Sequence, residues 1–276
     1  DACDYSIGGF EPVVSWFIPG ASNGLPVVAD LDGDGAPEVV ANMLDGLLGP
    51  SHMEVWAGDG SMMLWEDTKH KLAYGSHPAV ADTDGDGEPE IFMVISYKDN
   101  LFGAGEFSVG KWAADGTFLT ESDHFTDWSF DHATGLILAD MDHDGVVEVV
   151  AGRAILTPDL ITRAIGNRGR GASSGLEGVA EEGSHPAVAD LDLDGEQEII
   201  TGNAAYNADA RVMWSQPGLS DGSPSIANLD DDPEGEFVIS VGNQIRAQDS
   251  DGALMWGPLT IKSGNIRSEE HTSELQ

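Results

Sequence analysis

One phrase occurs five times along the chain, and this repetition limits the possible folds more than any other feature. Each copy consists of a short apolar segment, a run in which aspartate alternates with other residues, a glutamate and a second apolar segment. The aspartate runs begin at positions 30, 82, 140, 190 and 228. Spacings of roughly 40 to 60 residues are typical of one supersecondary unit per copy. The chain therefore repeats one structural unit at least five times.

The segments on both sides of each aspartate run are typical of β-strands. Proline precedes several runs, as at Pro78, and is tolerated there only at the first position of a strand or on an edge. β-Branched and apolar residues follow each run, as at Val149 and Val150. Asp-Gly pairs within apolar segments at 55–65, 111–119 and 245–256 predict hairpins with two-residue turns. Each repeat thus supplies about four strands, and a sheet of that size must stack on its neighbours.

The repeats predict an all-β protein, namely a β-propeller of four-stranded antiparallel blades. At least five blades are present, and we expect them to be a fragment of a ring of six to eight. Trp65, Trp214 and Trp256 end their repeats and are expected to pack between blades. Trp16 is expected to close a blade whose beginning is missing. The third repeat is irregular and carries a long glycine-rich insertion between Ile155 and Ser184.

The predicted propeller covers residues 1–262, and residues 263–276 lose the repeat pattern and read as an unstructured, non-native-looking tail. The chain has neither a starting methionine nor a signal peptide, so we expect an internal fragment of a longer protein. Cys3 is the only cysteine, so an internal disulfide is impossible. Another stabilising device, such as a bound metal, must replace it.

Composition excludes several classes of partner. The chain has 49 acidic and 12 basic side chains and a formal net charge of -37. Nucleic acids and anionic membrane surfaces require clusters of lysine and arginine, so we expect neither as a partner. No segment approaches the roughly 18 consecutive apolar residues of a membrane span, so membrane insertion is not expected. With 41% hydrophobic residues and 35 glycines, the chain reads as a folded protein with many tight turns that attracts cations.

The aspartate runs have the chemistry of a cation site. In the first run, Asp30, Asp32, Asp34 and Glu38 stand at positions 1, 3, 5 and 9 of a loop, and Gly35 permits a sharp bend. Carboxylates this close repel by up to about 4 kcal/mol per pair at an effective dielectric near 20. Oxygen ligands without histidine or cysteine favour a hard cation, and a flexible loop favours Ca²⁺ over Mg²⁺.

Two other interpretations of these loops are weaker. An EF-hand needs a glutamate at position 12, where the first loop has Ala41 and the others also lack a carboxylate. Aspartate and glycine can form turns without any metal, which would account for a single loop. Turn formation without a metal does not account for a glutamate at position 9 in all five loops.

Together with the strings VVAG at Val149–Gly152 and IITG at Ile199–Gly202, the loops resemble the FG-GAP and VCBS repeats of integrin-α-like propellers. The resemblance covers roughly residues 10 to 260. It implies calcium held by the side chains at positions 1, 3, 5 and 9 and by the carbonyl oxygen at position 7. That family usually has aspartate at position 9, whereas every copy here has glutamate, which reaches further.

Carried over residue by residue, the resemblance implies four full calcium sites and a weaker fifth. The calcium loops would be 30–38, 82–90, 140–148, 190–198 and 228–236. The implied ligands are Asp30, Asp32, Asp34, Ala36 and Glu38; Asp82, Asp84, Asp86, Glu88 and Glu90; Asp140, Asp142, Asp144, Val146 and Glu148; Asp190, Asp192, Asp194, Glu196 and Glu198; and Asn228, Asp230, Asp232 and Glu236. The fifth loop is expected to be weakest, because Asn228 replaces an aspartate and Pro233 a glycine.

The chain carries few signs of an active site. It has no nucleophile elbow, phosphate loop or zinc-binding spacing. His77 and His185 occur in the same phrase, SHPAVAD, which indicates a structural role in the repeat. His124 and His132 stand near several aspartates outside the repeat pattern, either in an acidic surface loop or in a metal or acid-base site.

Two functional classes remain. The resemblance implies a calcium-binding recognition or adhesion module, extracellular or on the cell surface, that binds a protein or glycan and belongs to a longer chain with other domains. The alternative is the propeller domain of a secreted polysaccharide lyase or other carbohydrate-active enzyme, which would need a base in a groove. We expect no catalytic residue from the repeats themselves. Arg163, Arg168 and Arg170 are hypothesised to lie together on an exposed loop and to bind an anionic glycan.

Overall fold

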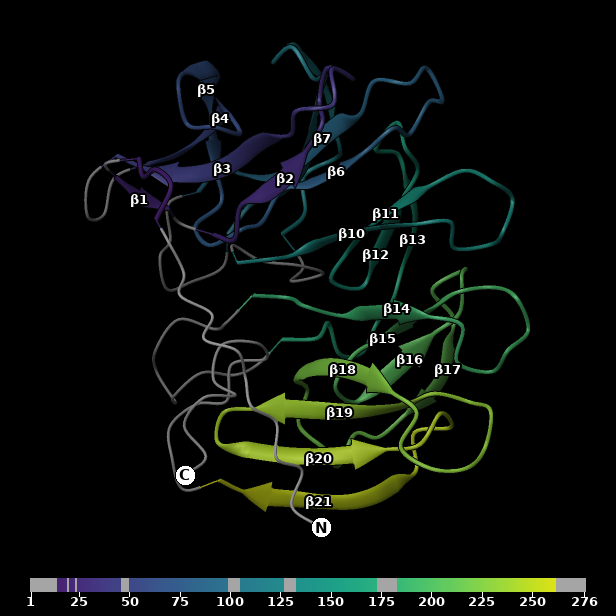
Figure 1. Cartoon of the computed structure of the whole chain (residues 1–276). Coiled ribbons are helices and arrows are strands. Elements are labelled where there is room, and N and C mark those ends of the chain that lie inside the picture. Colours follow the sequence, from purple (N-terminus) through teal and green to yellow (C-terminus); the bar gives the residue numbers. More distant parts are fainter. Residues whose placement is uncertain are drawn as a thin grey trace.

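The computed structural model describes residues 14–18, 20–22, 24–45, 50–98, 105–126, 133–172 and 183–261, and these contain strands and no helix (Figure 1). The strands form five antiparallel meanders. The first meander has β2 (Val27–Ala29), β3 (Glu38–Leu44), β4 (Ser51–Ala57) and β5 (Met63–Leu72), and the second has β6 (Ala79–Ala81), β7 (Glu90–Ser96), β8 (Phe107–Trp112) and β9 (Phe118–Glu121). The third has β10 (Leu136–Ala139), β11 (Glu148–Ala151), β12 (Ala154–Leu156) and β13 (Thr162–Ile165). The fourth has β14 (Ala187–Ala189), β15 (Glu198–Ile200), β16 (Ala204–Tyr206) and β17 (Val212–Ser215), and the fifth has β18 (Ser223–Ala227), β19 (Glu236–Val241), β20 (Gln244–Gln248) and β21 (Leu254–Thr260).

Within each meander the strands pair in chain order. The third, fourth and fifth meanders are separate four-stranded sheets. The first two belong to one larger sheet, because Leu72 at the end of β5 pairs with Ile95 of β7, and the short β1 (Ala21–Ser22) adds to β3. The prediction of an all-β protein with four-stranded antiparallel sheets is therefore confirmed.

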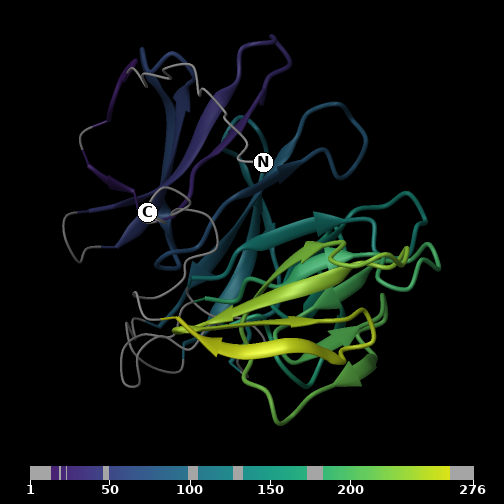
Figure 2. The ribbon, with the colours of Figure 1, turned by 60° about the horizontal axis from the view of Figure 1, so that its bottom comes forward.

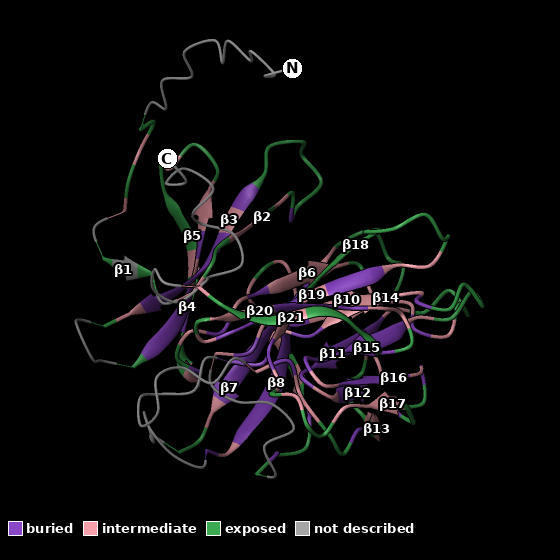
Figure 3. Cartoon of the chain, turned by 90° about the horizontal axis from the view of Figure 1, so that it is seen from below, coloured by how far each residue is buried: buried purple, intermediate pink, exposed green. Residues whose placement is uncertain are grey.

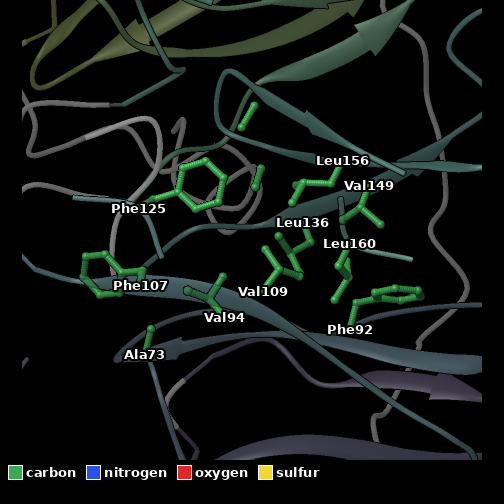
Figure 4. Packing of buried hydrophobic residues seen from close by; sticks show 12 residues of the cluster. Ala73, Phe92, Val94, Phe107, Val109, Phe125, Leu136, Val149, Leu156 and Leu160 are labelled. Carbon is green, nitrogen blue, oxygen red and sulfur yellow. The ribbon is translucent and has the colours of Figure 1, made fainter. Parts of the chain in front are cut away.

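The hydrophobic core lies between successive meanders. Four clusters of buried side chains each join strands of two neighbouring meanders. Figure 4 shows the cluster between the second and third, in which Phe92, Val94 and Val109 face Leu136 and Val149. The middle strands β7 and β8 are buried almost throughout, because they are covered on both faces, while the connecting loops are exposed (Figure 3).

The first strands of the five meanders lie beside one another in chain order. Contacts join β2 to β6, β6 to β10, β10 to β14 and β14 to β18. The meanders consequently share one side, on which their first strands meet, and the later strands spread outwards from it (Figures 1 and 2). The loops between first and second strands all leave from corresponding positions.

Tryptophans connect the first meander to the second and the fourth to the fifth. The indole N–H of Trp65 in β5 donates to the carbonyl oxygen of Ala114 in the next meander, at 2.9 Å, and Trp214 in β17 donates to Ser250 at 2.9 Å. Trp16 donates in the same way to Gly58 of the first meander, at 3.0 Å. Trp65 and Trp214 therefore pack between meanders as predicted. Trp256 of β21 is 40% exposed.

Several predictions fall outside the described residues. These are the tail at 263–276, residues 173–182 of the glycine-rich insertion, and His132 with the aspartates beside it, Asp127 and Asp131. No helix in the described ranges is long and apolar enough to cross a membrane.

Candidate metal centres

Each aspartate loop connects the first and second strands of a meander, and the strand register fixes its glutamate. The residue before each loop pairs with the position 9 glutamate, as Ala29 does with Glu38 and Ala189 with Glu198. In all five loops one carboxylate oxygen of this glutamate accepts the backbone N–H of position 2. The donors are Leu31 (2.8 Å), Thr83 (2.9 Å), Met141 (2.9 Å), Leu191 (2.6 Å) and Leu229. The second oxygen of each glutamate accepts no hydrogen bond from the loop backbone.

Hydrogen bonds from the loop backbone hold the position 1 and position 5 aspartates. The N–H of the position 6 glycine donates to the position 1 aspartate, as Gly195 does to Asp190 at 3.1 Å. The N–H of position 7 donates to the position 5 aspartate, as Glu196 does to Asp194 at 2.8 Å. The same bonds occur in the loops beginning at Asp30, Asp82 and Asp140. The backbone thereby aims these carboxylates into each loop.

The chain turns sharply at positions 4 and 6. Position 6 has a positive φ in the first four loops, 99° at Gly195 for example, as expected for glycine. Position 4 is also left-handed, with φ of 60° at both His143 and Leu193. Residues with a side chain seldom adopt this conformation, so the loop geometry is imposed against a local preference. His143 is exposed.

The loops bring carboxylate oxygens together. In each of the first four, one oxygen from each of three acidic residues lies within 4.8 Å of the other two. The groups are Asp30, Asp32 and Glu38; Asp82, Asp84 and Asp86; Asp140, Asp142 and Glu148; and Asp190, Asp192 and Asp194. Oδ1 of Asp142 is buried and accepts no hydrogen bond from the described residues. These residues fit a hard cation that takes oxygen ligands.

The raised pKa of a glutamate in the fourth loop also favours a bound cation. Burial and, after it, the neighbouring Asp192, Asp194 and Asp190 raise the pKa of Glu198 to about 7, although the N–H of Leu191 opposes the shift. Burial also raises the pKa of Glu148 in the third loop, although Arg163 opposes this shift. Glu198 is therefore only partly ionised at neutral pH, and a bound cation would restore its charge.

Two loops contain a cation of the chain itself, which the sequence analysis missed. In the third, the Arg163 guanidinium donates to Asp142 Oδ2 at 2.6 Å and to Glu148 Oε1 at 2.9 Å. In the second, Nζ of the buried Lys111 lies 3.5 Å from Glu90 Oε2. Both side chains come from later strands of the same meander, so no feature of the loop sequence indicates them.

The fifth loop differs as its sequence suggested. Asn228 donates through its side-chain nitrogen to the carbonyl oxygens of Asp232, at 2.7 Å, and Glu234, at 3.4 Å. The amide thus donates to two loop carbonyl oxygens, one of them at position 7, where a calcium loop would offer that oxygen to the cation. Glu236 is fully buried and its Oε1 has no partner among the described residues, so one oxygen remains open.

The arginine hypothesis is wrong for Arg163, which lies in β13 with its guanidinium on the third loop rather than on an exposed loop. Arg168 is exposed and follows this strand. Its carbonyl oxygen accepts a hydrogen bond from Arg153 Nη1 at 2.8 Å, and its N–H donates to the Tyr206 hydroxyl at 2.6 Å. The N–H of Arg170 donates to Asp221 at 2.8 Å. Arg153, Arg168 and Arg170 therefore gather where the third and fourth meanders meet.

The predicted histidines have ordinary structural partners. His124 Nδ1 lies 2.8 Å from Glu106, which also pairs with Lys98 at 2.5 Å. The rings of His77 and His185 lie 5.3 Å apart, one at the entry to β6 and the other at the entry to β14. Burial and, after it, the neighbouring His77 lower the pKa of His185 to about 4, so this ring is uncharged at neutral pH. Burial also lowers the pKa of His77.

Together the fold and its loops define a class: all-β proteins of stacked antiparallel meanders with acidic loops suited to cations. No family model matches the chain. It is 24% identical to the rhamnogalacturonan endolyase YesW of Bacillus subtilis (strain 168) over 289 residues, covering 83% of this chain and 46% of the relative. It is 26% identical to the rhamnogalacturonan exolyase YesX of the same organism over 294 residues, covering 83% and 47%. The chain spans about half the length of these relatives.

Solved structures share the fold. The V. cholerae biofilm matrix protein Bap1 superposes with a TM-score of 0.65 and 19% identity, over 86% of this chain and 39% of Bap1. The Bacillus licheniformis rhamnogalacturonan lyase PL11 gives a TM-score of 0.63 and 22% identity, over 86% and 50%. The YesW structure gives 0.60 and 18%, over 88% and 51%.

The comparisons correct the family prediction. The resemblance to FG-GAP and VCBS repeats of integrin-α-like proteins is wrong, because the sequence relatives are rhamnogalacturonan lyases and no family model matches. The integrin-like adhesion role implied by that resemblance falls with it. Of the two functional classes, the polysaccharide lyase is the better supported.

Proposed function

We propose that this chain is a calcium-loaded β-propeller portion of a secreted polysaccharide lyase that acts on rhamnogalacturonan. The observation that carries the proposal is the similarity to two rhamnogalacturonan lyases over 83% of the chain. An extracellular location follows from the size of the substrate. Residues 1–262 would form this portion, and further segments of a longer chain would complete the enzyme.

The arrangement of the meanders supports the propeller. Their first strands contact one another in sequence, and their cores lie between successive sheets. Four-stranded sheets that stack in this way around a common side are the building plan of a propeller. We keep the prediction that five meanders are part of a larger ring.

Calcium is proposed for the first four loops with the ligands given above, and more weakly for the fifth. The convergence of three carboxylates in each of four loops supports it, as does the open Oδ1 of Asp142. Backbone bonds orient the position 7 residues Ala36, Glu88, Val146 and Glu196, whose carbonyl oxygens are proposed as further ligands. Calcium would hold the hairpins that lead from the first to the second strands.

The substrate is proposed to lie near Arg168. Galacturonate residues carry carboxylates, which arginine binds through paired hydrogen bonds. Much of the remaining positive charge is already used: Lys111 and Arg163 serve the loops, and Arg246 is buried with hydrogen bonds to backbone carbonyls. Arg168 is the exposed arginine beside Tyr206 and Arg153.

The test combines binding with cleavage. The full chain is run through native gels that contain rhamnogalacturonan or neutral galactan, with calcium and with chelator, and its lyase activity is followed by the ultraviolet absorbance of the C4–C5 double bond formed. We expect retardation by rhamnogalacturonan in calcium, with or without turnover by this portion alone. Arg168→Ala should reduce the retardation, whereas Arg211→Ala, at an exposed arginine paired with Asp209, should not. Absence of both binding and cleavage would refute the proposal.

A further inference from the structure

A group of side chains outside the aspartate loops has the chemistry of a second kind of metal site. One ring nitrogen of His52 and one carboxylate oxygen from each of Glu54 and Glu66 lie within 4.8 Å of one another. We call this group the His52 site. It lies on the first meander, where His52 pairs with Met43 near the far end of β3 from Glu38.

Strand geometry brings these side chains together. His52 and Glu54 are two residues apart in β4 and so point to the same face. Glu66 of β5 pairs directly with Glu54 across the sheet. Two like charges directly opposite each other are unfavourable in an antiparallel pair. A cation between them would turn this repulsion into attraction.

The imidazole is held in place and aimed at the carboxylates. His52 is 8% exposed, and its Nε2 lies 3.1 Å from Glu54 Oε1. The other Glu54 oxygen accepts the indole N–H of Trp56 at 2.7 Å, which fixes the carboxylate. Nδ1 of His52 is buried, makes no hydrogen bond with the described residues and lies 3.6 Å from Asp45 Oδ1.

We propose that the His52 site binds a divalent transition-metal ion of the zinc class. Zinc accepts nitrogen and carboxylate ligands, whereas calcium takes oxygen ligands. With metal–ligand distances near 2.0 to 2.2 Å in a tetrahedron, two donor atoms stand about 3.3 Å apart. The separation of His52 Nε2 and Glu54 Oε1 is already close to this value.

Asp45 has the position of an orienting group. Histidine that binds a metal usually donates its other ring N–H to a carboxylate, which fixes the tautomer. With Nε2 on the metal, Nδ1–H of His52 would face Asp45. Glu66 is exposed, so the fourth position of the ion would face solvent and accept water or an external ligand.

The test titrates ZnCl₂ into the full chain by calorimetry, in about 10 mM calcium so that the aspartate loops are saturated. We expect one zinc equivalent. His52→Gln and Glu66→Gln should each weaken binding at least about tenfold, and Asp45→Asn by about tenfold with the stoichiometry kept. Co²⁺ in place of Zn²⁺ should give the visible absorption of a low-coordinate site, lost in Glu66→Gln.

A matched control distinguishes zinc binding at the His52 site from nonspecific zinc binding by other histidines and carboxylates. His124 also contacts one glutamate, but Lys98 already neutralises that glutamate, so His124→Gln should leave zinc binding unchanged. Glu66 is exposed, and its variant keeps the inference testable if His52→Gln fails to fold. The inference is overturned if zinc does not bind in saturating calcium, or if it binds equally well to Glu66→Gln.

Discussion

Replacing Asp192 by alanine should destabilise the protein in calcium but not in chelator. The hydrogen bonds that shape the fourth loop go to Asp190 and Asp194, as Gly195 N–H does to Asp190 at 3.1 Å and Glu196 N–H to Asp194 at 2.8 Å. Asp192 makes neither of these bonds, so we expect it to act as a calcium ligand rather than as a support of the loop. Without metal, its removal eliminates one of the charges that raise the pKa of Glu198.

The size of the effect follows from linkage between binding and folding. Extracellular calcium modules bind at roughly 0.1 to 1 mM, so a site at the tight end gains about 1.4 kcal/mol in about 1 mM calcium. Losing the site should lower the melting temperature by about 3 to 6 °C for a chain of this size. The assay is thermal unfolding followed by circular dichroism, in about 1 mM calcium and in chelator.

Three outcomes check the reasoning. Asp192→Ala should lose more stability in calcium than Asp230→Ala, because the Asn228 amide already occupies the fifth loop. In chelator, Asp192→Ala should melt at the wild-type temperature or above it. Equal destabilisation in calcium and in chelator would mean that Asp192 supports the loop itself, and it would refute the prediction that Asp192 binds calcium.

Three other predictions follow from the same contacts. In chelator, thermal unfolding should show stability falling as pH rises from 4.5 through about 7, because Glu198 has a raised pKa and binds its proton more tightly when folded; Glu198→Gln should reduce this dependence, and the raised pKa of Glu148 should leave a part of it. Arg163→Gln should lower the melting temperature more in chelator than in calcium, since it leaves the carboxylates of the third loop without their internal cation. Trp65→Phe should reduce the free energy of unfolding by about 1 kcal/mol in urea titrations through loss of its bond to Ala114, whereas Trp256→Phe should have a smaller effect.

The fold was predictable because its signals are local and repeated. Each aspartate run stands between two apolar segments, and the structure places it between the first and second strands of a meander. The glutamate at position 9 was also visible in the sequence. The structural role of this glutamate was not visible, because it depends on the strand register. In that register Glu198 pairs with Ala189 and accepts the N–H of Leu191.

The parts that sequence reasoning missed depend on distant residues or on the backbone. Arg163 reaches Asp142 from two strands later, and nothing in the third loop reveals the contact. The left-handed residue at position 4 was hidden because His143 and Leu193 replace the glycines of the first two loops. The three side chains of the His52 site likewise meet only through pairing of β4 with β5.

The family prediction failed because it rested on the aspartate loops and the short strings that follow them. An alternating run of aspartates is a local motif that can turn the chain from one strand to the next around a cation. The same motif can occur in unrelated proteins built of meanders. Glutamate at position 9 in every copy was already a departure from the suggested family. Similarity over 83% of the chain tests far more positions than a loop of nine residues.

The charge of the protein bears on how it would bind a polyuronate. Four calcium ions would add eight positive charges to a formal net charge of -37, so the chain would still repel an anionic polysaccharide at long range. Such repulsion is screened beyond about 8 Å at physiological ionic strength, whereas a direct contact with Arg168 is screened much less. Affinity for rhamnogalacturonan is therefore expected to rise between low and physiological salt, unlike that of a basic protein, which would fall. A steady decline with salt would mean that positive charge outside the described residues dominates the binding.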